Sequence, residues 1–337
     1  MKKTKSFEKP VILLNIDSLM PQALEVVAQT GRAPALQYLM ENGTYFSDMV
    51  TSFPAMSVTI DSSLLTGTYA DQHRIPGLHW FDIRNKEFIN YGTGFRETFR
   101  IGMKRSIHNM LYRLNHEHLS KDVTTIYEDL AKKGISSASI NSFVYRGNKA
   151  QRLKTPRFLS SFTQFENGEW VANVPSIFSL GVFSKIRPRG IPTEIAAGNY
   201  KYVAKELRYL IRRKKLPGFT FCIFQDMDLR IHFKGPLDLK LILKIDREIQ
   251  KIFNMYTSWD EAISKNIWMV IGDNGHSATG TNHRKYVIDL RKTFKKFQIA
   301  RIQQKVTKKD QLALCVNQRM TLIYLLDQKL SYNELIE

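Results

Sequence analysis

Short apolar runs alternate with amphipathic stretches along most of the chain. Runs of β-branched and other apolar residues that end in polar residues are typical of strands buried in a parallel sheet. Four such runs occupy residues 9–17, 135–143, 219–228 and 266–275. Stretches with helical spacing separate them, at residues 33–43, 124–134, 196–215 and 237–259. The alternation predicts an α/β fold in which helices flank a largely parallel central sheet.

The predicted strands end in carboxylates. Asp17, Asp226, Asp228 and Asp273 lie at or just after the end of a predicted strand. Sheets of this kind bind ligands at the carboxyl ends of their strands, so we expect a functional site at this edge. Taken singly, an Asp in such a position is more often a turn or capping residue.

Two segments interrupt the rhythm of strands and helices. They span about residues 82–118 and 145–192, and both are irregular, aromatic and basic. We expect them to be insertions that cap the active edge of a single domain over residues 1–337.

The C-terminal part of the chain reads as two strands, at residues 310–316 and 320–326, followed by a helix start. Ser331 and Glu334 have the spacing of a capping box, and only three residues follow them. We therefore expect the chain to stop where a further element begins, with the C-terminal part of the domain absent.

The composition is that of a globular protein with a large positive charge. Of 337 residues, 43% are hydrophobic, and 50 Lys and Arg against 31 Asp and Glu give a net charge of +19. Basic clusters such as RYLIRRKKLPGF favour anionic partners. We favour a lysine-rich solvated surface as their explanation, because no nucleic-acid-binding motif accompanies them. We therefore disfavour a nucleic-acid partner and retain small anionic substrates.

The two cysteines, Cys222 and Cys315, lie in apolar runs. This excludes a disulfide scaffold and a cysteine zinc site, and it suits two unreactive core thiols in a reducing compartment. The apolar run after Pro10 is shorter than the core of a signal peptide, and no stretch approaches the ~20 apolar residues of a membrane span. We expect a cytoplasmic protein that has no membrane partner.

Acidic, hydroxyl and imidazole side chains gather in three parts of the sequence. These candidate site residues are Asp17, Ser57, Asp228, His232, Asp273 and His276. Carboxylates and imidazoles from distant strand ends suit a pair of divalent cations, and a hydroxyl beside such ions can act as a nucleophile. Each signal alone also fits a helix cap, a turn or a polar core residue.

Together these segments make the chain resemble the type I phosphodiesterase/nucleotide pyrophosphatase family of the alkaline phosphatase superfamily. SVTIDSSLLTGTYADQH, residues 57–73, matches the nucleophile segment of that family without a gap. The matches keep their order across residues 11–290. The others are the first-strand Asp, a D-x-x-x-H motif and a D-x-G motif, at Asp17, at Asp228 with His232, and at Asp273 with Gly275.

The resemblance implies an alkaline phosphatase-like fold and a site for two divalent metal ions, usually zinc. One ion would be held by Asp17, Ser57 and Asp273, and the other by Asp228 and His232. Ser57 would attack the phosphorus of a phosphodiester or pyrophosphate and form a phospho-enzyme that water hydrolyses. The implied substrate is a small phosphate ester or a nucleotide.

The chain departs from the family pattern at three places. Asn274 stands where the family has a His ligand, and His276 is the candidate replacement. Leu78 stands near the position of a phosphate-binding Asn, and neighbouring His79 is the candidate substitute. No T-H-G or S-H-G segment with a last His ligand follows residue 290. Because a zinc site normally uses at least three protein ligands, we expect weakened metal binding and low activity.

Several alternatives stay open. A degenerate relative could keep the fold and bind phosphorylated ligands without catalysis, or the chain could hydrolyse phosphomonoesters or transfer phosphate. The C/S-x-P-x-R motif of sulfatases is absent. Thr59 is the alternative nucleophile, which the ungapped match disfavours. Weaker candidates for site residues are His73, His79, Trp80, Tyr145, Arg146 and His283.

Overall fold

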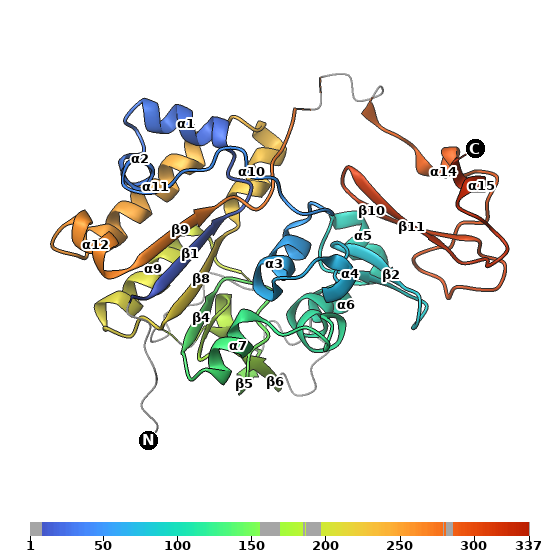
Figure 1. Cartoon of the computed structure of the whole chain (residues 1–337). Coiled ribbons are helices and arrows are strands. Elements are labelled where there is room, and N and C mark those ends of the chain that lie inside the picture. The colour runs from blue at the N-terminus through green and yellow to red at the C-terminus, as the bar shows by residue number, and fades with distance from the viewer. Residues whose placement is uncertain are drawn as a thin grey trace.

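The chain, seen in a computed structural model, is built on a parallel five-stranded sheet (Figure 1). The structure describes residues 9–155, 169–184, 186, 197–278, 280 and 286–336. Within these residues the strand order is β7-β4-β8-β1-β9, and every neighbouring pair is parallel. The strands are β1 (Val11–Ile16), β4 (Ser137–Ile140), β7 (Ile177–Ser179), β8 (Phe219–Phe224) and β9 (Ile267–Ile271). The predicted α/β fold with a largely parallel sheet is confirmed.

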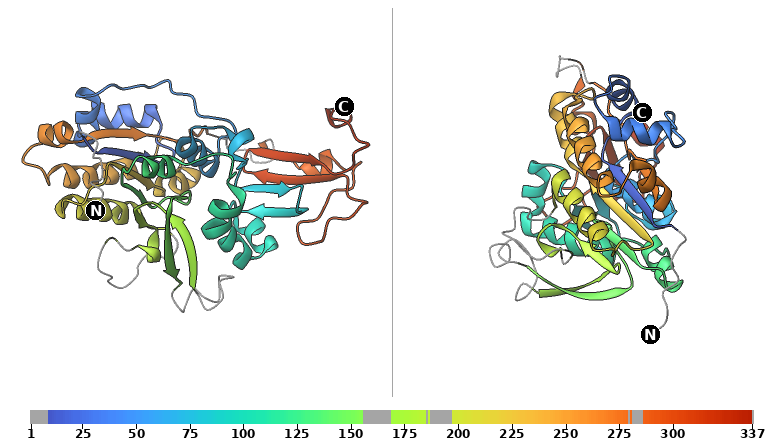
Figure 2. Two further views of the ribbon diagram at one scale, coloured as in Figure 1. Left: turned by 60° about the horizontal axis from the view of Figure 1, so that its bottom comes forward. Right: turned by 90° about the vertical axis from the view of Figure 1, so that its left-hand side faces the viewer.

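Successive side chains of a strand point to opposite faces of the sheet, and both faces are covered by helices (Figure 2). Ile12, Leu14 and Ile16 of β1 belong to one buried cluster, whereas Leu13 packs against another. The first cluster draws on α1 (Pro21–Gln29), α2 (Pro34–Glu41), α9 (Tyr200–Arg212), α11 (Lys240–Phe253) and α12 (Trp259–Lys265). The second draws on α3 (Ser57–Thr66), α7 (Ile126–Lys132) and the π-helix η1 (Asn109–His118).

Local sequence explains why these helices form and where they begin. Helix α11 buries Leu241, Ile245, Ile249 and Ile252, which recur every three or four residues on one face. Helix α9 begins at the side chain of Asn199, which accepts hydrogen bonds from two backbone N–H groups of the first turn.

Two antiparallel hairpins form a smaller lobe beside the sheet (Figure 2). They pair β2 (His79–Asp82) with β3 (Glu87–Asn90), and β10 (Leu312–Asn317) with β11 (Met320–Leu325). The Asn317 side chain joins the hairpins, because it accepts from the His79 N–H at 2.8 Å and donates to the His79 carbonyl at 2.7 Å. This contact fixes the turn between β10 and β11 relative to the rest of the molecule.

The two predicted insertions contain regular structure. Residues 82–118 include β3, α5 (Phe95–Ile101), α6 (Met103–His108) and η1, so the prediction of an irregular segment is wrong. Residues 145–192 include β5 (Lys149–Lys154), β6 (Glu169–Val174) and the short helix η3 (Gly181–Phe183), and their strand β7 belongs to the central sheet. Residues 156–168, 185 and 187–192 of this segment lie outside the described residues. The capping role of both segments stays a prediction.

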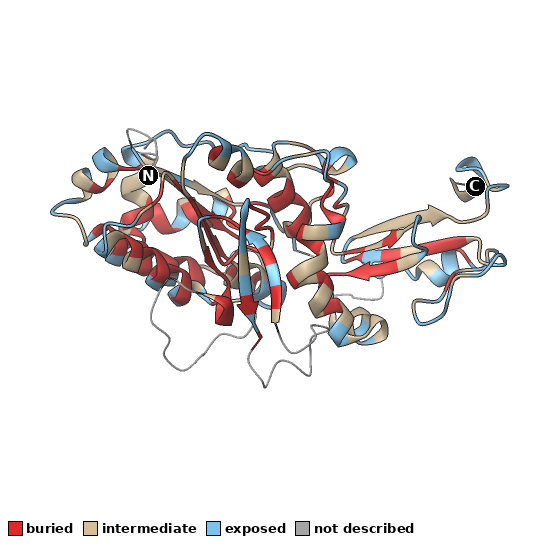
Figure 3. Cartoon of the chain, turned by 90° about the horizontal axis from the view of Figure 1, so that it is seen from below, coloured by how far each residue is buried: buried red, intermediate tan, exposed pale blue. Residues whose placement is uncertain are grey.

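The remaining short helices are α4 (Ala70–His73), α10 (Asp226–Lys234), α14 (Leu290–Thr293) and α15 (Asn333–Ile336). Figure 3 shows that buried residues follow the central strands and the inner faces of the helices. Cys222 and Cys315 are both free thiols in this interior, as expected. Of the helices in the described part of the chain, not one has the length and apolar character that crossing a membrane requires.

Three histidines lie in the interior of the protein. His73, His79 and His118 are buried, and desolvation lowers the pKa of His73 and of His79 to about 4 and that of His118 to about 3. All three are therefore neutral near pH 7. His79 is 1% exposed and lies against Phe88, so its ring is not available to a phosphate ligand.

We expect the free energy of unfolding to depend less on pH in a His79→Gln variant than in the unsubstituted protein. The unfolded chain protonates His79 near pH 6.5, but the folded protein does so only near pH 4, so stability is lost as the pH falls through this window. Removing this imidazole should lower the slope of the unfolding free energy against pH by about 1.4 kcal/mol per pH unit in this window. Urea unfolding of both proteins at several pH values measures the difference, and the other buried ionisable groups cancel. Parallel curves would contradict the prediction.

Candidate active site

Three carboxylates, those of Asp17, Asp228 and Asp273, meet where the central strands end. Asp17 directly follows β1, and Asp273 stands two residues after β9. Strand β8 ends at Phe224, so Asp226 and Asp228 lie in the first turn of α10, and the predicted strand over residues 219–228 extends too far. Asp228 still reaches the site because α10 begins at the same edge of the sheet. Among the described contacts, Asp226 takes no part in the cluster.

Asp17 and Asp273 are a buried carboxylate pair, 7% and 3% exposed. Desolvation, together with the negative charges of Asp273 and Asp228, raises the pKa of Asp17 well above its ordinary value. Burial also raises the pKa of Asp273, although its Oδ1 accepts from the N–H groups of Ser18 at 2.9 Å and Asn274 at 3.0 Å. Among the described residues, neither carboxylate has an ion pair with Lys or Arg. The pair is therefore suited to a proton or a cation.

Ser57 lies beside this pair. It is the first residue of α3, and its Oγ donates to Asp17 Oδ1 at 3.4 Å. Backbone N–H groups in the first turn of a helix have no acceptor within that helix and favour an anion. Thr59 is fully buried on α3, so its hydroxyl is not accessible to a substrate. The predicted nucleophile therefore has the more accessible position of the two.

A second set of potential ligands lies next to Asp228. Its Oδ1 is 3.0 Å from His276 Nε2 and 3.3 Å from His232 Nε2, and the three ligand atoms all lie within 4.8 Å of one another. The imidazole rings are nearly perpendicular, with centroids 4.8 Å apart. Desolvation acts to raise the pKa of Asp228, but the two histidines and Ser18 lower it by more, so that it lies below its ordinary value.

The residues present fit divalent metal ions. Imidazole nitrogens and carboxylate oxygens are the ligands that zinc and manganese use in proteins. Asp228 lies within ion-pair distance of His232 and His276. In the described part of the chain, Asp17 and Asp273 have no ion pair. Three carboxylates without a lysine or arginine partner leave negative charge that a cation would offset.

Two residues bear on the missing family histidine: Asn274, which stands at its position, and His276, the candidate replacement. The Asn274 amide, in the orientation that satisfies its hydrogen bonds, donates to Asp273 Oδ1 at 2.8 Å. Asn274 therefore supports a carboxylate from the side. His276 reaches Asp228 and His232 but has no described contact with Asp17 or Asp273. It is a third potential ligand beside Asp228 and His232, so three potential ligands gather where two were expected.

Three neighbouring residues are missed by the sequence analysis. Ser18 places its hydroxyl among the ligands, 3.0 Å from Asp228 Oδ1. The turn between β10 and β11 brings Gln318, whose amide nitrogen is 3.3 Å from His232 Nε2, and Arg319, which donates to Ser277 Oγ at 2.8 Å. No local motif marks the turn, because its proximity follows from how the hairpin packs.

The weaker candidates are mostly structural. His73 accepts the N–H of Ile75 at Nδ1 and lies 3.0 Å from Ser63 Oγ at Nε2, so it supports α3. Arg146 pairs with Glu128 at 3.2 Å and donates to backbone carbonyls. The other candidates are Tyr145, buried in the core, Trp80, packed edge-on against His118, and His283, which is outside the described residues.

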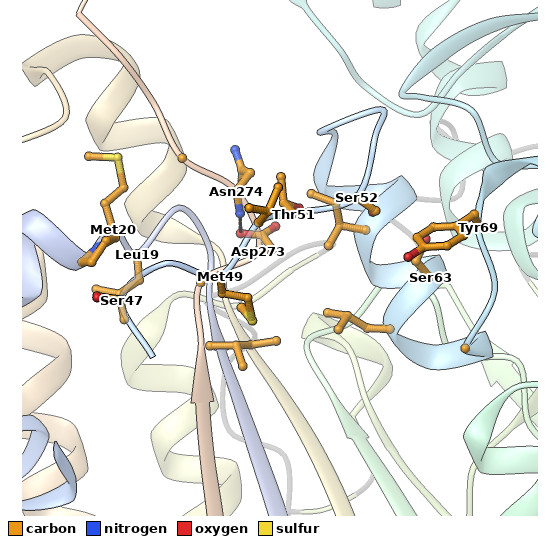
Figure 4. Close-up of a pocket in the computed structure, with 18 of the residues that line it drawn as sticks. Leu19, Met20, Ser47, Met49, Thr51, Ser52, Ser63, Tyr69, Asp273 and Asn274 are labelled. Carbon is orange, nitrogen blue, oxygen red and sulfur yellow. Dashed lines mark hydrogen bonds between the residues drawn. The ribbon is translucent and has the colours of Figure 1, made fainter. Parts of the chain in front are cut away.

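A pocket of about 430 Å³ adjoins the carboxylate pair (Figure 4). Asp273 and Asn274 lie near the middle of the lining residues, between Met20 and Ser47 on one side and Ser63 and Tyr69 on the other. This volume lies in the range of small-molecule sites. Ser57 is not among the residues that line it.

Comparisons with known proteins point to one family. A family model for type I phosphodiesterase / nucleotide pyrophosphatase matches residues 11–333. A comparison with curated proteins finds no match. The solved structure of murine ectonucleotide pyrophosphatase / phosphodiesterase 5 is 15% identical, with a TM-score of 0.62 over 97% of this chain and 68% of that chain.

A bacterial structure is similar to the same extent. Phosphonoacetate hydrolase from Sinorhizobium meliloti 1021, in complex with phosphonoformate, is 14% identical, with a TM-score of 0.57 over 97% of this chain and 71% of that chain. At 14% and 15% sequence identity, structural similarity shows only that the fold is shared. With the family match, it confirms the predicted alkaline phosphatase-like architecture.

Proposed function

Because the chain belongs to the type I phosphodiesterase / nucleotide pyrophosphatase family, we propose that it hydrolyses phosphodiester or pyrophosphate bonds with Ser57 as nucleophile. One observation carries the proposal: the Ser57 hydroxyl lies beside Asp17, at the same edge of the sheet as Asp228, His232 and His276. Hydroxyl, carboxylates and imidazoles are the groups that metal-assisted phosphoryl transfer requires.

Two divalent ions, with zinc as the first candidate, would complete the site. Asp17, Ser57 and Asp273 would hold one, and Asp228, His232 and His276 the other. When bound, such ions favour loss of the serine proton and offset the negative charge of the reacting phosphate.

The residues of the chain then have distinct tasks. Asp17 orients Ser57 through the hydrogen bond that its Oδ1 accepts. Attack forms a bond between Ser57 Oγ and phosphorus while the bond from phosphorus to the leaving oxygen breaks, which leaves a serine phosphodiester that keeps the second ester group of the substrate. A water molecule then attacks phosphorus, the bond to Ser57 Oγ breaks, and a phosphate monoester is released with the serine restored.

We propose a small nucleotide, another phosphate ester or a phosphonate as substrate. A variant of the murine relative made inactive by one substitution is in complex with AMP, and the bacterial relative is in complex with phosphonoformate. The net charge of +19 would attract such anions. A cytoplasmic location, inferred from two buried free thiols, stays a prediction.

Asn274 favours a second candidate function. Its amide supports Asp273 and does not replace the imidazole of the family pattern. The first metal set then contains two carboxylates and a hydroxyl, a weak combination for zinc. A protein that binds phosphorylated ligands with little turnover is the alternative.

Metal removal tests the proposal. We expect protein loaded with zinc or manganese to contain about two ions per chain and to hydrolyse bis-p-nitrophenyl phosphate. Chelation with EDTA should abolish the hydrolysis, and adding back the metal should restore it. Elemental analysis and nitrophenolate absorbance measure the two quantities.

An Asp228→Asn variant tests the same point by substitution, because it keeps the shape of the side chain and removes its charge. It should lose metal and activity together. Activity that survives EDTA would contradict metal dependence, and a metal-loaded protein without hydrolysis would favour the binding function.

A further inference from the structure

The hydroxyl of Ser18 lies among the charged groups of the candidate site. Its Oγ is 3.0 Å from Asp228 Oδ1, 3.0 Å from His276 Nε2 and 3.3 Å from Asp17 Oδ1. The residue is fully buried. Ser18 therefore contacts both metal sets proposed above.

The hydroxyl of Ser18 cannot donate to Asp17 and Asp228 at the same time. A hydroxyl has one hydrogen to donate, and a carboxylate oxygen can only accept. If that hydrogen goes to Asp228, Asp17 Oδ1 faces an oxygen lone pair at 3.3 Å. A cation bound between these oxygens would attract both of them and remove the unfavourable contact.

The distances resemble those between ligands of one ion. Ser18 Oγ, Asp228 Oδ1 and His276 Nε2 form a triangle with three sides of 3.0 Å. Ligand atoms at right angles around an ion, with bonds of about 2.1 Å, lie about 3.0 Å apart. The three atoms thus have the spacing of one face of an octahedral coordination shell, the geometry that manganese uses, whereas tetrahedral zinc would place them about 3.4 Å apart.

The backbone holds Ser18 in this place. Its φ of 63° is in the left-handed region, which residues with a side chain rarely adopt. The Ser18 N–H donates to Asp273 Oδ1 at 2.9 Å, which ties this conformation to the carboxylate pair. Backbone conformations of this kind concentrate at functional sites.

We propose that Ser18 is a metal ligand, which through Oγ joins Asp228, His232 and His276 around one divalent ion. The inference rests on the metal dependence proposed above. Ser18 would bring that set to four protein ligands, the number usual for zinc. The hydroxyl of Ser18 is a neutral oxygen donor. With it, the site would bind manganese more favourably than a site of Asp228, His232 and His276 alone.

Binding measurements on metal-free protein test this role without any assay of activity. We expect Ser18→Gly to weaken the affinity for Zn²⁺ and Mn²⁺ by about tenfold or more in titration calorimetry, in line with the effect of losing a supporting group at a metal site. Glycine suits the left-handed backbone, so thermal unfolding of the metal-free variant should be unchanged or improved. Equal or tighter metal binding in Ser18→Gly would overturn the proposal, because the hydroxyl would then only fill the space.

A second variant gives a spectroscopic readout. Ser18→Cys with Co²⁺ should show a near-ultraviolet thiolate-to-cobalt charge-transfer band, since a thiolate at this position would bind the ion. Ser62→Cys, a buried serine on α3 that donates to the Val58 carbonyl at 2.7 Å, is the control and should lack the band. Absence of the band in cobalt-loaded Ser18→Cys would overturn the proposal.

The outcomes separate this inference from the function on which it rests. If the unsubstituted protein binds metal, Asp228→Asn weakens that binding and Ser18→Gly does not, only the role of Ser18 fails. If the unsubstituted protein binds no divalent metal, the metal dependence fails, and the role of Ser18 with it.

Discussion

Replacing Ser57 with alanine is expected to lower the rate of bis-p-nitrophenyl phosphate hydrolysis by about 10⁴-fold or more, the scale of loss seen when a nucleophile is removed. The variant removes the oxygen that lies 3.4 Å from Asp17 Oδ1 and that would form the bond to phosphorus. Initial rates at saturating metal measure the effect. A nitrophenyl phosphate adduct of Ser57, trapped by acid quenching and located by mass spectrometry, should be present in the unsubstituted protein and absent from Ser57→Ala.

Thr59 offers a matched control two residues along the same helix. It is fully buried, so Thr59→Val, which keeps the shape of the side chain, should change the rate by less than about tenfold. Loss of activity in Thr59→Val with activity retained in Ser57→Ala would reverse the assignment of the nucleophile. Equal activity in all three proteins would place the chemistry elsewhere.

The sequence predicts the sheet because its signals are local. Strands β1, β8 and β9 are short apolar runs, and each is followed within a few residues by a carboxylate. Parallel strands place their carboxyl ends at one edge, so Asp17, Asp228 and Asp273 could be grouped before any coordinates were known. The order of strands in the sheet carries no such local signal, since it depends on which buried faces fit together.

The wrong strand end before α10 and the unforeseen contact of His276 with Asp228 also have physical causes. Asp226 and Asp228 continue an apolar run, so the pattern extends the strand to them, whereas the chain turns into α10 after Phe224. The contact of His276 with Asp228, 48 residues earlier in the chain, depends on the path of a loop. Periodicity describes regular elements and does not predict where an irregular loop places a side chain.

The turn between β10 and β11 shows the same limit at longer range. Its residues Gln318 and Arg319 contact His232 and Ser277 only because Asn317 anchors the hairpin to the backbone of His79. The two strands of the hairpin were predicted, but their position beside the site follows from packing between hairpins. Site residues supplied in this way are found only in three dimensions.

Gly272→Ala is expected to destabilise the protein by about 3 kcal/mol, a large overpacking effect, and to weaken metal binding at least tenfold. A Cβ at position 272 would lie 2.0 Å from the carbonyl oxygen of Leu19 and 2.9 Å from its carbonyl carbon. These are backbone atoms, which cannot rotate away as the end of a side chain can. The end of β9 must therefore separate from the segment that follows β1.

That separation would act on the site directly. Asp273 follows Gly272, and its Oδ1 accepts the Ser18 N–H at 2.9 Å across the same contact. Moving the two segments apart would lengthen this bond and open the pair formed by Asp17 and Asp273. Urea unfolding measures the loss of stability, and calorimetric titration of metal into the metal-free protein measures the loss of affinity.

Gly275 supplies the control three residues away. A Cβ there would meet only Met20, with Sδ at 3.7 Å and Cγ at 3.9 Å, which are ordinary contacts with a flexible side chain. Gly275→Ala should therefore change stability by no more than about 0.5 kcal/mol and leave metal affinity unchanged. If Gly272→Ala behaved like Gly275→Ala, the close approach of β9 to Leu19 would not be what holds the carboxylates together. The metal set of Asp17 and Asp273 would then tolerate a wider spacing than this structure has.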